Sequence, residues 1–197
     1  MTQNGARVSQ YLHGLAELAR RVAEDHSEAI ATIVTLTVNA FERGNKLMFC
    51  GNGGSAADAQ HLATEYVVRF RADRRALPAI ALTTDTSLLT AAANDYGFAR
   101  VFARQVASLG RSGDLLFLHS TSGESANLLE AAREARAHGV VTVALLARGG
   151  GALRSEVDHA IVLPTDDGAH AQELHLAIGH VICEQVESWL HSAPDPQ

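Results

Sequence analysis

Apolar residues recur along the chain at two different periods, one before and one after residue 44. Within residues 7–43 they follow helical spacing in two successive stretches, and Gly44 is a plausible end for the second. Beyond residue 45, short apolar runs without alternation are separated by helical segments. Unbroken apolar runs are typical of strands that are covered on both faces. The pattern therefore predicts two N-terminal helices followed by an α/β core.

The core is predicted to hold a parallel sheet. The apolar runs that predict its strands are residues 46–50, 78–82, 114–119, 140–146 and 159–163. Helices are predicted between and after them, at about 55–70, in short pieces through 90 and on to 109, at 124–137, after the glycines 149–151, and at 170–191. Such alternation indicates a three-layer, doubly wound α/β fold with five parallel strands and right-handed crossovers. We expect one domain over residues 1–197, in which 1–44 supply helices for oligomer packing and 45–191 form the core.

Composition limits the classes of protein to consider. A chain of 197 residues with 47% hydrophobic content is long enough for one well-filled core. The formal net charge of −6 gives no general attraction to nucleic acid or anionic lipid. No apolar run reaches the ~18–20 residues of a membrane span, and the N-terminus lacks the apolar core of a signal peptide. We therefore expect a soluble, cytoplasmic protein that binds neither nucleic acid nor membranes.

The two cysteines and a cluster of arginines have simple structural interpretations. Cys50 and Cys183 lie in apolar stretches, which indicates buried thiols rather than a disulfide scaffold. The one local concentration of positive charge is formed by Arg69, Arg71, Arg74 and Arg75. It is typical of a solvated helix end and loop, in which Arg69 could face inward.

Two polar loops follow predicted strands at the edge of the sheet where ligands bind. Residues 51–55 (GNGGS) follow the first strand, and residues 120–125 (STSGES) follow the third. Helix N-termini at this edge present free N–H groups to ligands. The first of these, the glycine loop, matches neither a P-loop nor G-x-G-x-x-G. A tight strand-to-helix turn that needs glycine therefore explains it about as well as a ligand-binding loop does. An N-cap explains one hydroxyl of the second loop but not four, which makes that loop the better phosphate candidate.

Candidate acid-base groups lie on two predicted helices. His61 and Glu65 are four residues apart and therefore share one helix face. A solvent-facing pair is the ordinary explanation for that spacing. His180 lies in the otherwise apolar last helix, where a satisfied core histidine is the simpler explanation when it is taken alone.

Together these pieces resemble a known family. The chain is similar over nearly its whole length to the phosphoheptose isomerases (sedoheptulose 7-phosphate isomerases) of the flavodoxin-like sugar-isomerase (SIS) fold. The matching segments, in order and at compatible spacing, are CGNGGSAADAQH with Glu65, PAIALTTDTS, AAANDYGF, STSGESAN, and Gln172-Glu173 with His175 and His180. The resemblance implies an isomerase that converts D-sedoheptulose 7-phosphate to D-glycero-D-manno-heptose 7-phosphate via an enediol. That reaction is the first step of nucleotide-activated heptose biosynthesis.

The resemblance also implies roles for individual residues. Glu65 and His180 match the acid-base pair. The residues that match substrate contacts are Asn52, Gly53, Gly54, Ser55, Arg69, Asn94, Asp95, Ser120, Thr121, Ser122, Ser125 and Gln172. The residues that match the ligands of one zinc ion per subunit are His61, Glu65, Gln172 and His180. Glu65 cannot easily be a tight ligand and a free base at once. The resemblance therefore allows a catalytic, a structural or a regulatory role for the metal.

The spacing of Gln172 and His180 bears on assembly. Eight residues along one helix correspond to roughly 12 Å of rise, so the two side chains cannot meet within a continuous helix. They converge if Gln172 precedes the helix, or if they come from different subunits. Because relatives suggest a tetramer, we expect a homotetramer with active sites at subunit interfaces.

Three places depart from the family pattern. In residues 167–171, relatives carry an acidic and a basic residue just ahead of the position of Gln172. At Glu124 they carry Asn or Lys, and in place of Leu118-His119 they have a small or apolar residue before the serine loop. Glu124 would place a negative charge beside the phosphate site. The alternative function is that of a non-catalytic SIS-fold protein that binds the bacterial replication initiator. That branch loses the acid-base residues, whereas this chain keeps both.

Overall fold

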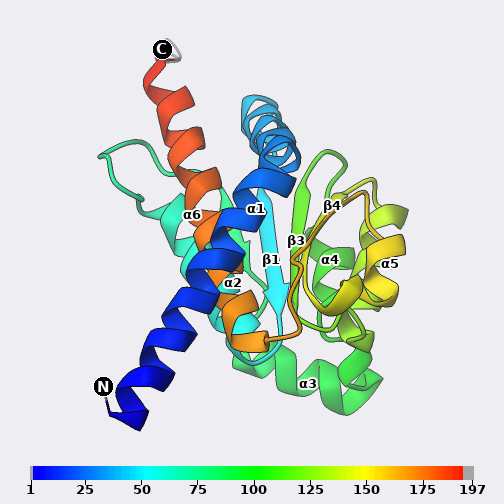
Figure 1. The fold of residues 1–197 in the computed structure, drawn as a ribbon. Helices are drawn as coiled ribbons and strands as arrows, with labels where there is room; N and C mark the ends of the chain where they lie inside the picture. The colour runs from blue at the N-terminus through cyan, green and yellow to red at the C-terminus, as the bar shows by residue number, and fades with distance from the viewer. Residues whose placement is uncertain (1, 193–197) are drawn as a thin grey trace.

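Five parallel strands form the central sheet of the structure, a computed structural model that describes residues 2–192 (Figure 1). The strands are β1 (Leu47–Gly51), β2 (Ala79–Ala81), β3 (Leu115–Ser120), β4 (Val141–Leu146) and β5 (His159–Val162). They lie in the order β2-β1-β3-β4-β5. Every predicted strand is found, with shifts of no more than one residue at either end. Residues 1 and 193–197 of the predicted domain lie outside the described part.

Helices cover both faces of this sheet. They are α1 (Gln3–Glu42), α2 (Gly54–Val67), α3 (Thr86–Tyr96), α4 (Ala103–Leu109), α5 (Ala126–Ala137) and α6 (Gly168–Ser192), with the short 3-10 helices η1 (Phe98–Arg100), η2 (Arg148–Gly150) and η3 (Ala152–Ser155). On one face α1, α2 and α6 pack against Phe49 and Phe117, whose rings stack at 4.9 Å. On the other face α3, α4 and α5 pack against Met48 and Leu116. These three layers confirm the predicted fold class.

The prediction of two N-terminal helices was wrong, because α1 is one continuous helix of 40 residues. The polar residues between the two apolar stretches, Glu24 to Glu28, include neither glycine nor proline, so nothing there ends a helix. Val22 and Ile33, one from each stretch, are both buried in the same core cluster. The interruption in the apolar pattern therefore does not mark a break in the helix.

Other general expectations can be compared directly. Cys50 and Cys183 are buried free thiols, as predicted. No described helix combines the length and the apolar character that crossing a membrane requires.

The strand order places a topological switch point between β1 and β3. Gly51, at the end of β1, pairs with His119 near the end of β3. From these two strands the chain proceeds to opposite sides of the sheet, and such points form the crevice in which open α/β sheets bind ligands. The loops 51–55 and 120–125 both begin at this crevice.

Candidate active site

A pair of amide side chains fastens the two loops together. Asn52 Nδ2 donates to Asn127 Oδ1 at 2.9 Å, and Asn127 Nδ2 donates to Asn52 Oδ1 at 2.8 Å. Asn127 lies in the first turn of α5 and is buried. Sequence reasoning did not single it out, although it belongs to the segment STSGESAN. Its position just beyond a run of hydroxyls was the available signal.

Residues 120–125, here called the hydroxyl loop, are held in shape by hydrogen bonds to their own backbone. Ser120 Oγ accepts a hydrogen bond from the Gly123 N–H at 2.9 Å, and Ser122 Oγ accepts one from the N–H two residues on at 3.3 Å. Ser125 is the N-cap residue of α5, but its side chain makes no capping hydrogen bond. Gly123 has φ of 68°, and a Cβ there would overlap the carbonyl oxygen of Gly150. The loop is thus a constrained cup of hydroxyl groups at a helix N-terminus, which is a geometry suited to phosphate.

Glu124 does not direct a free charge at this cup. Its Oε1 accepts a hydrogen bond from the Ala152 N–H at 2.9 Å, at the start of η3. The carboxylate therefore connects the hydroxyl loop to the segment after β4. The negative charge expected beside the phosphate site is held by a neighbouring backbone group instead.

The glycine loop meets α6 at the same edge of the sheet. Gly53 has φ of 57° and precedes α2, while Ser55 is buried in its first turn. Gly54 is in close contact with the side-chain amide of Gln172. The structure thus brings Asn52, Gly53, Gly54, Ser55 and Gln172 into one group.

The segment before Gln172, another departure from the family pattern, begins α6. Asp167 Oδ1 accepts hydrogen bonds from the N–H groups of Ala169 at 2.8 Å and His170 at 3.2 Å. These N–H groups lie in the first turn, where helix donors lack intrahelical partners. Asp167 is therefore an N-terminal cap, and Gln172 lies inside the helix rather than before it.

A second cluster lies further along α2. His61 Nε2 is 2.9 Å from His180 Nε2 and 3.1 Å from Glu65 Oε1. The His180 ring stacks on Phe70, with ring centroids 5.2 Å apart. Thus the structure brings together the two residues that match the acid-base pair, although they are distant in sequence.

This cluster has the donors that zinc uses. Among the described residues it is the only group of three His, Cys, Asp or Glu side chains whose ligand atoms all lie within 4.8 Å of one another. Two imidazole nitrogens and a carboxylate oxygen leave a fourth position open, as in catalytic zinc sites. Ligand atoms about 2.1 Å from a tetrahedral ion are roughly 3.4 Å apart, a few tenths of an ångström more than the separations of 2.9 and 3.1 Å found here. The cluster therefore fits a zinc ion.

Burial and neighbouring charge affect the acid-base groups. Burial, followed by the nearby His61, lowers the pKa of His180, which favours a neutral imidazole. Asp58 lies one turn before His61 on α2, and burial raises its pKa to about 6. Its Oδ2 is buried without a hydrogen-bond partner in the described structure. Sequence reasoning missed Asp58, whose spacing from His61 was the only signal.

The two groups lie toward opposite ends of α2. Roughly 16 Å of helix separates Gly54 from Glu65. Gln172 and His180 are likewise roughly 12 Å apart along α6, and because α6 begins at Gly168, Gln172 does not precede that helix. Arg69 follows α2 at the Glu65 end and is exposed. Arg69 therefore accompanies the His-Glu-His cluster, whereas Gln172 accompanies the loops.

Two more predicted substrate contacts lie on a separate element. Asn94 and Asp95 are exposed near the C-terminal end of α3, and Asn94 Nδ2 donates to Asp95 Oδ1 at 2.8 Å. Figure 1 shows α3 below the carboxyl end of β1, on the side where the two loops open. A contact of Asn94 or Asp95 with a ligand of the loops stays a prediction.

Comparison with known proteins decides the family. The SIS domain model matches residues 10–147. A phosphoheptose isomerase from Roseiflexus sp. strain RS-1 is 52% identical over 174 residues, 88% of each chain. A phosphoheptose isomerase from Solidesulfovibrio magneticus is 48% identical over 194 residues, 98% of this chain and 95% of that one. This chain belongs to the phosphoheptose isomerases of the SIS domain family.

A solved structure supports the same assignment. The phosphoheptose isomerase of Neisseria gonorrhoeae superposes with a TM-score of 0.90 at 37% identity, covering 94% of this chain and 100% of that one. The family resemblance found in the sequence is therefore confirmed, together with the fold that it implied.

Proposed function

We propose that this protein is an isomerase that converts D-sedoheptulose 7-phosphate to D-glycero-D-manno-heptose 7-phosphate. The observation that carries the proposal is the contact of His61 with both Glu65 and His180, which gathers an acid-base set in a phosphoheptose isomerase chain. The non-catalytic alternative, a protein that binds the replication initiator, is not favoured by any contact described above. Cytoplasmic location and a place at the first step of nucleotide-activated heptose synthesis are further predictions of this function.

The proposed chemistry uses one carboxylate and one imidazole. Glu65 removes a proton from C1 of the ketose, its carboxyl group exchanges with solvent, and it delivers a proton to C2 of the planar enediol, since one carboxylate beside that plane reaches both carbons. His180 moves a proton between the oxygens on C1 and C2. Because its pKa is lowered, its imidazole is neutral near pH 7 and can accept as well as donate.

The substrate phosphate is proposed to bind in the hydroxyl loop. Thr121, Ser122 and Ser125 are partly exposed there, at the start of α5. Hydroxyl donors and the N-terminal dipole of a helix both favour a phosphate dianion. Anchoring the phosphate leaves the ketone end of the sugar several carbons away, where a separate acid-base set is required.

We also propose one zinc ion per subunit, bound by His61, one carboxylate oxygen of Glu65, His180 and Gln172 of the partner subunit, so that the second oxygen of Glu65 is left to act as the base. Gln172 of the same chain is too far along α6 to reach the cluster. When bound, zinc would supply positive charge near the oxygens of the reacting carbons. Metal analysis of the purified protein should give one zinc per chain, and His61→Gln should lose it while remaining folded. Full zinc retention by that variant would contradict the site.

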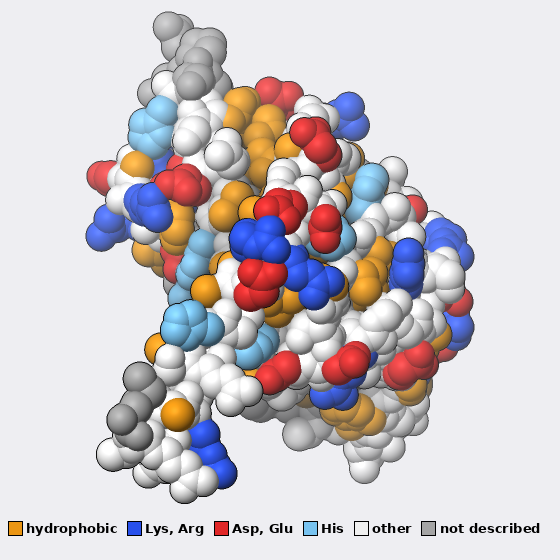
Figure 2. All heavy atoms as spheres, in the orientation of Figure 1, with side chains coloured by type: hydrophobic (Ala, Val, Ile, Leu, Met, Phe, Trp, Pro, Cys, Tyr) orange, Lys and Arg blue, Asp and Glu red, His pale blue; other side chains and the backbone are white. Residues whose placement is uncertain are grey.

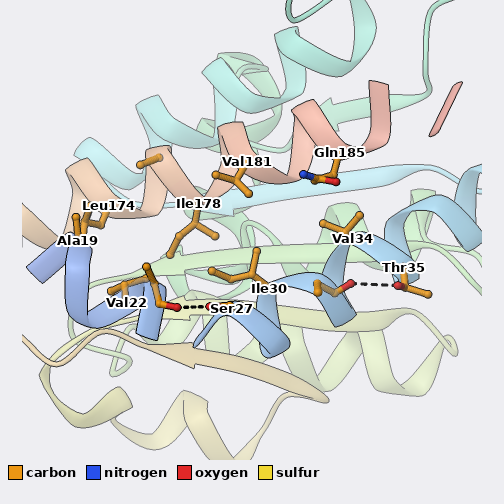
Figure 3. A pocket seen from close by; sticks show the side chains of 13 residues that line it. Ala19, Val22, Ser27, Ile30, Val34, Thr35, Leu174, Ile178, Val181 and Gln185 are labelled. Carbon is orange, nitrogen blue, oxygen red and sulfur yellow. Dashed lines mark hydrogen bonds between the residues drawn. The ribbon is translucent and has the colours of Figure 1, made fainter. Parts of the chain in front are cut away.

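A homotetramer with shared active sites is the proposed assembly. Between α1 and α6 lies a hollow of about 640 Å³, lined mainly by apolar side chains such as Val22, Ile30, Ile178 and Val181 (Figures 2 and 3). Figure 3 shows these side chains directed toward one another from the two helices. Val181 on the wall of this hollow is 45% exposed, and a second chain that packs against α1 and α6 would cover it. Light scattering of the purified protein measures the number of copies.

The proposed function is tested by a product assay on ketose phosphates of five to seven carbons. Sedoheptulose 7-phosphate should be the preferred substrate, and in heavy water the product should carry deuterium at C2. Glu65→Gln and His180→Gln should each lower turnover by about a hundredfold or more, without changing the oligomer. His138→Gln, at the C-cap of α5, is the control and should retain wild-type turnover. Retained activity in both active-site variants would exclude the mechanism.

A further inference from the structure

One buried carboxylate holds the loop that follows α2 against α6. Glu187 is 5% exposed. Its oxygens accept hydrogen bonds from the N–H groups of Phe70 at 2.8 Å, Arg71 at 3.0 Å and Ala72 at 3.1 Å, and from Arg74 Nε at 3.2 Å. Burial raises the pKa of Glu187, but these donors outweigh it and leave the pKa below its ordinary value. Glu187 is therefore a charged carboxylate whose acceptor positions are filled.

Arg74 connects this carboxylate to the end of α2. The Arg74 side chain is 5% exposed, so Arg74 rather than Arg69 is the inward-facing arginine of the cluster. Its guanidinium donates to the carbonyl oxygens of Glu65 at 2.6 Å and Tyr66 at 2.7 Å. Carbonyls in the last turn of a helix lack intrahelical partners, and a cation is favoured beside them. Arg74 thereby holds the turn from which the Glu65 side chain projects.

Phe70 connects the same carboxylate to His180. The N–H of Phe70 is one of the donors to Glu187, and its ring stacks on the His180 imidazole with an interplanar angle of 25°. The guanidinium of Arg71 lies 5.1 Å from the centroid of the Phe70 ring. The position of that ring is therefore set by the segment that Glu187 binds.

We infer, on the basis of the function proposed above, that Glu187 and Arg74 are positioning residues of the isomerase. Their buried ion pair holds both the helix turn that carries Glu65 and the aromatic ring that orients His180. Proton shuttles lose much of their effect when they are misplaced by a fraction of an ångström to one ångström. Glu65 lies near the end of α2, beside an irregular loop, where a helix frays unless it is capped.

The buried ion pair of Glu187 and Arg74, here called the clamp, is informative because it is charged. A buried ion pair generally contributes no more to stability than apolar side chains of similar volume. In this one, every bond of the carboxylate goes to the loop beside the His-Glu-His cluster, and two bonds of the guanidinium go to the turn that carries Glu65. The pair therefore fixes relative positions that apolar contacts would leave less defined.

Glu187→Gln tests this role. The variant retains the size of the side chain but replaces an acceptor oxygen with an NH₂ group that faces N–H donors. We expect kcat to fall about tenfold or more while KM stays within about twofold, because the phosphate-binding loops are untouched. The matched control is Glu184→Gln, on the same helix, whose carboxylate pairs with Arg71 at the surface. That variant should retain wild-type kcat, and equal kcat in the two variants would overturn the inference.

Phe70 provides a second test if Glu187→Gln does not fold. Phe70→Leu keeps an apolar side chain but removes the stacked ring, so kcat should fall severalfold with little change in KM. Phe70→Tyr restores an aromatic ring and should restore most of kcat. Wild-type kcat in folded Phe70→Leu would overturn the inference.

A spectroscopic measurement separates this inference from the proposed function. In protein labelled with ¹³C-histidine, the His180 ring resonance is identified by its loss in His180→Gln, and it carries the ring-current shift of Phe70. That resonance should move in Glu187→Gln and Phe70→Leu but not in Glu184→Gln. Movement in a protein that isomerises no ketose phosphate would support the clamp and reject the function. An unmoved resonance in both folded variants would reject the clamp whatever the activity.

Discussion

Two buried histidines lie together next to the hydroxyl loop. His119 on β3 and His175 on α6 are both fully buried, with ring centroids 6.1 Å apart. Neither ring nitrogen of His119 has a hydrogen-bond partner among the described residues. Burial, followed by His175, lowers the pKa of His119 to about 3, and burial lowers that of His175 to about 4. His119 is therefore a neutral polar ring in an apolar environment.

Stability should consequently fall as the pH falls from about 6.5 toward 4. In the unfolded chain both rings bind a proton near the ordinary pKa of 6.5, whereas in the folded chain they bind one only at much lower pH. Protons therefore favour the unfolded state throughout this range. His119→Leu should make the decline shallower and should raise the free energy of unfolding near pH 7 by about 1 kcal/mol, because it removes two unpaired nitrogens. Urea unfolding between about pH 7 and 5 measures both effects.

The control for this prediction is His13→Gln, on the exposed side of α1. The free energy of unfolding of this variant should change with pH as steeply as that of the wild type. A His119→Leu protein whose stability changes with pH as steeply as that of the wild type would show that the buried ring does not contribute.

Sequence reasoning found the residue types of the site but not what their neighbours do to them. Glu124 was expected to bring negative charge to the phosphate loop, yet the Ala152 N–H accounts for its carboxylate. Arg69 was considered as an inward arginine, yet Arg74 is the buried one. Both outcomes depend on groups distant in sequence, and no local pattern contains them.

At the level of elements, the approach of α2 to α6 depends on Gly179. A Cβ at this position would overlap the side chain of Leu62, which is buried. Gly179→Ala would favour an isolated helix by about 1 kcal/mol. In the folded protein we expect it to lower the free energy of unfolding by about 1–3 kcal/mol, because Leu62 cannot move aside in a packed core. Urea unfolding provides the measurement.

The same substitution in a Leu62→Ala background is the informative control. Leu62→Ala alone should destabilise the protein by about 2–5 kcal/mol, because it leaves a cavity. Gly179→Ala added to it should be neutral or stabilising, since the obstructing side chain is gone and helix propensity remains. Equal destabilisation in both backgrounds would contradict a steric contact between these two residues.

Elements were predicted well where the apolar pattern is continuous and less well at their ends. The strands are unbroken apolar runs, and their bounds follow the prediction closely. The helix predicted to reach Phe70 ends at Val67, since the backbone N–H groups of Phe70 to Ala72 bind Glu187 instead of continuing the helix. A carboxylate on α6 thus decides where α2 ends.

At the scale of the whole molecule, the separation of the two groups determines what one chain can do alone. The loops and Gln172 lie at one end of α2, and Arg69 lies with His61, Glu65 and His180 toward the other. Zinc bound by the proposed four ligands would need Gln172 from a different chain. The spacing within the last helix already indicated this in the sequence, but no sequence pattern identifies which surfaces meet.

Shared sites make a prediction that can be tested by mixing two inactive variants. Ser122→Asp places a carboxylate in the phosphate loop and should prevent binding by repulsion, while His180→Gln lacks one acid-base group. If one chain supplies the loop and its partner supplies His180, a mixed pair contains one site with both parts intact. Random mixing of equal amounts should then restore up to about a quarter of wild-type activity. Co-expression with two affinity tags and purification through both isolates the mixed oligomers, and each variant carrying both tags serves as the inactive control. A site built within one chain cannot be repaired by its neighbour. If the wild-type protein is active but the mixed oligomers stay inactive, the loop and His180 of each site therefore belong to a single chain.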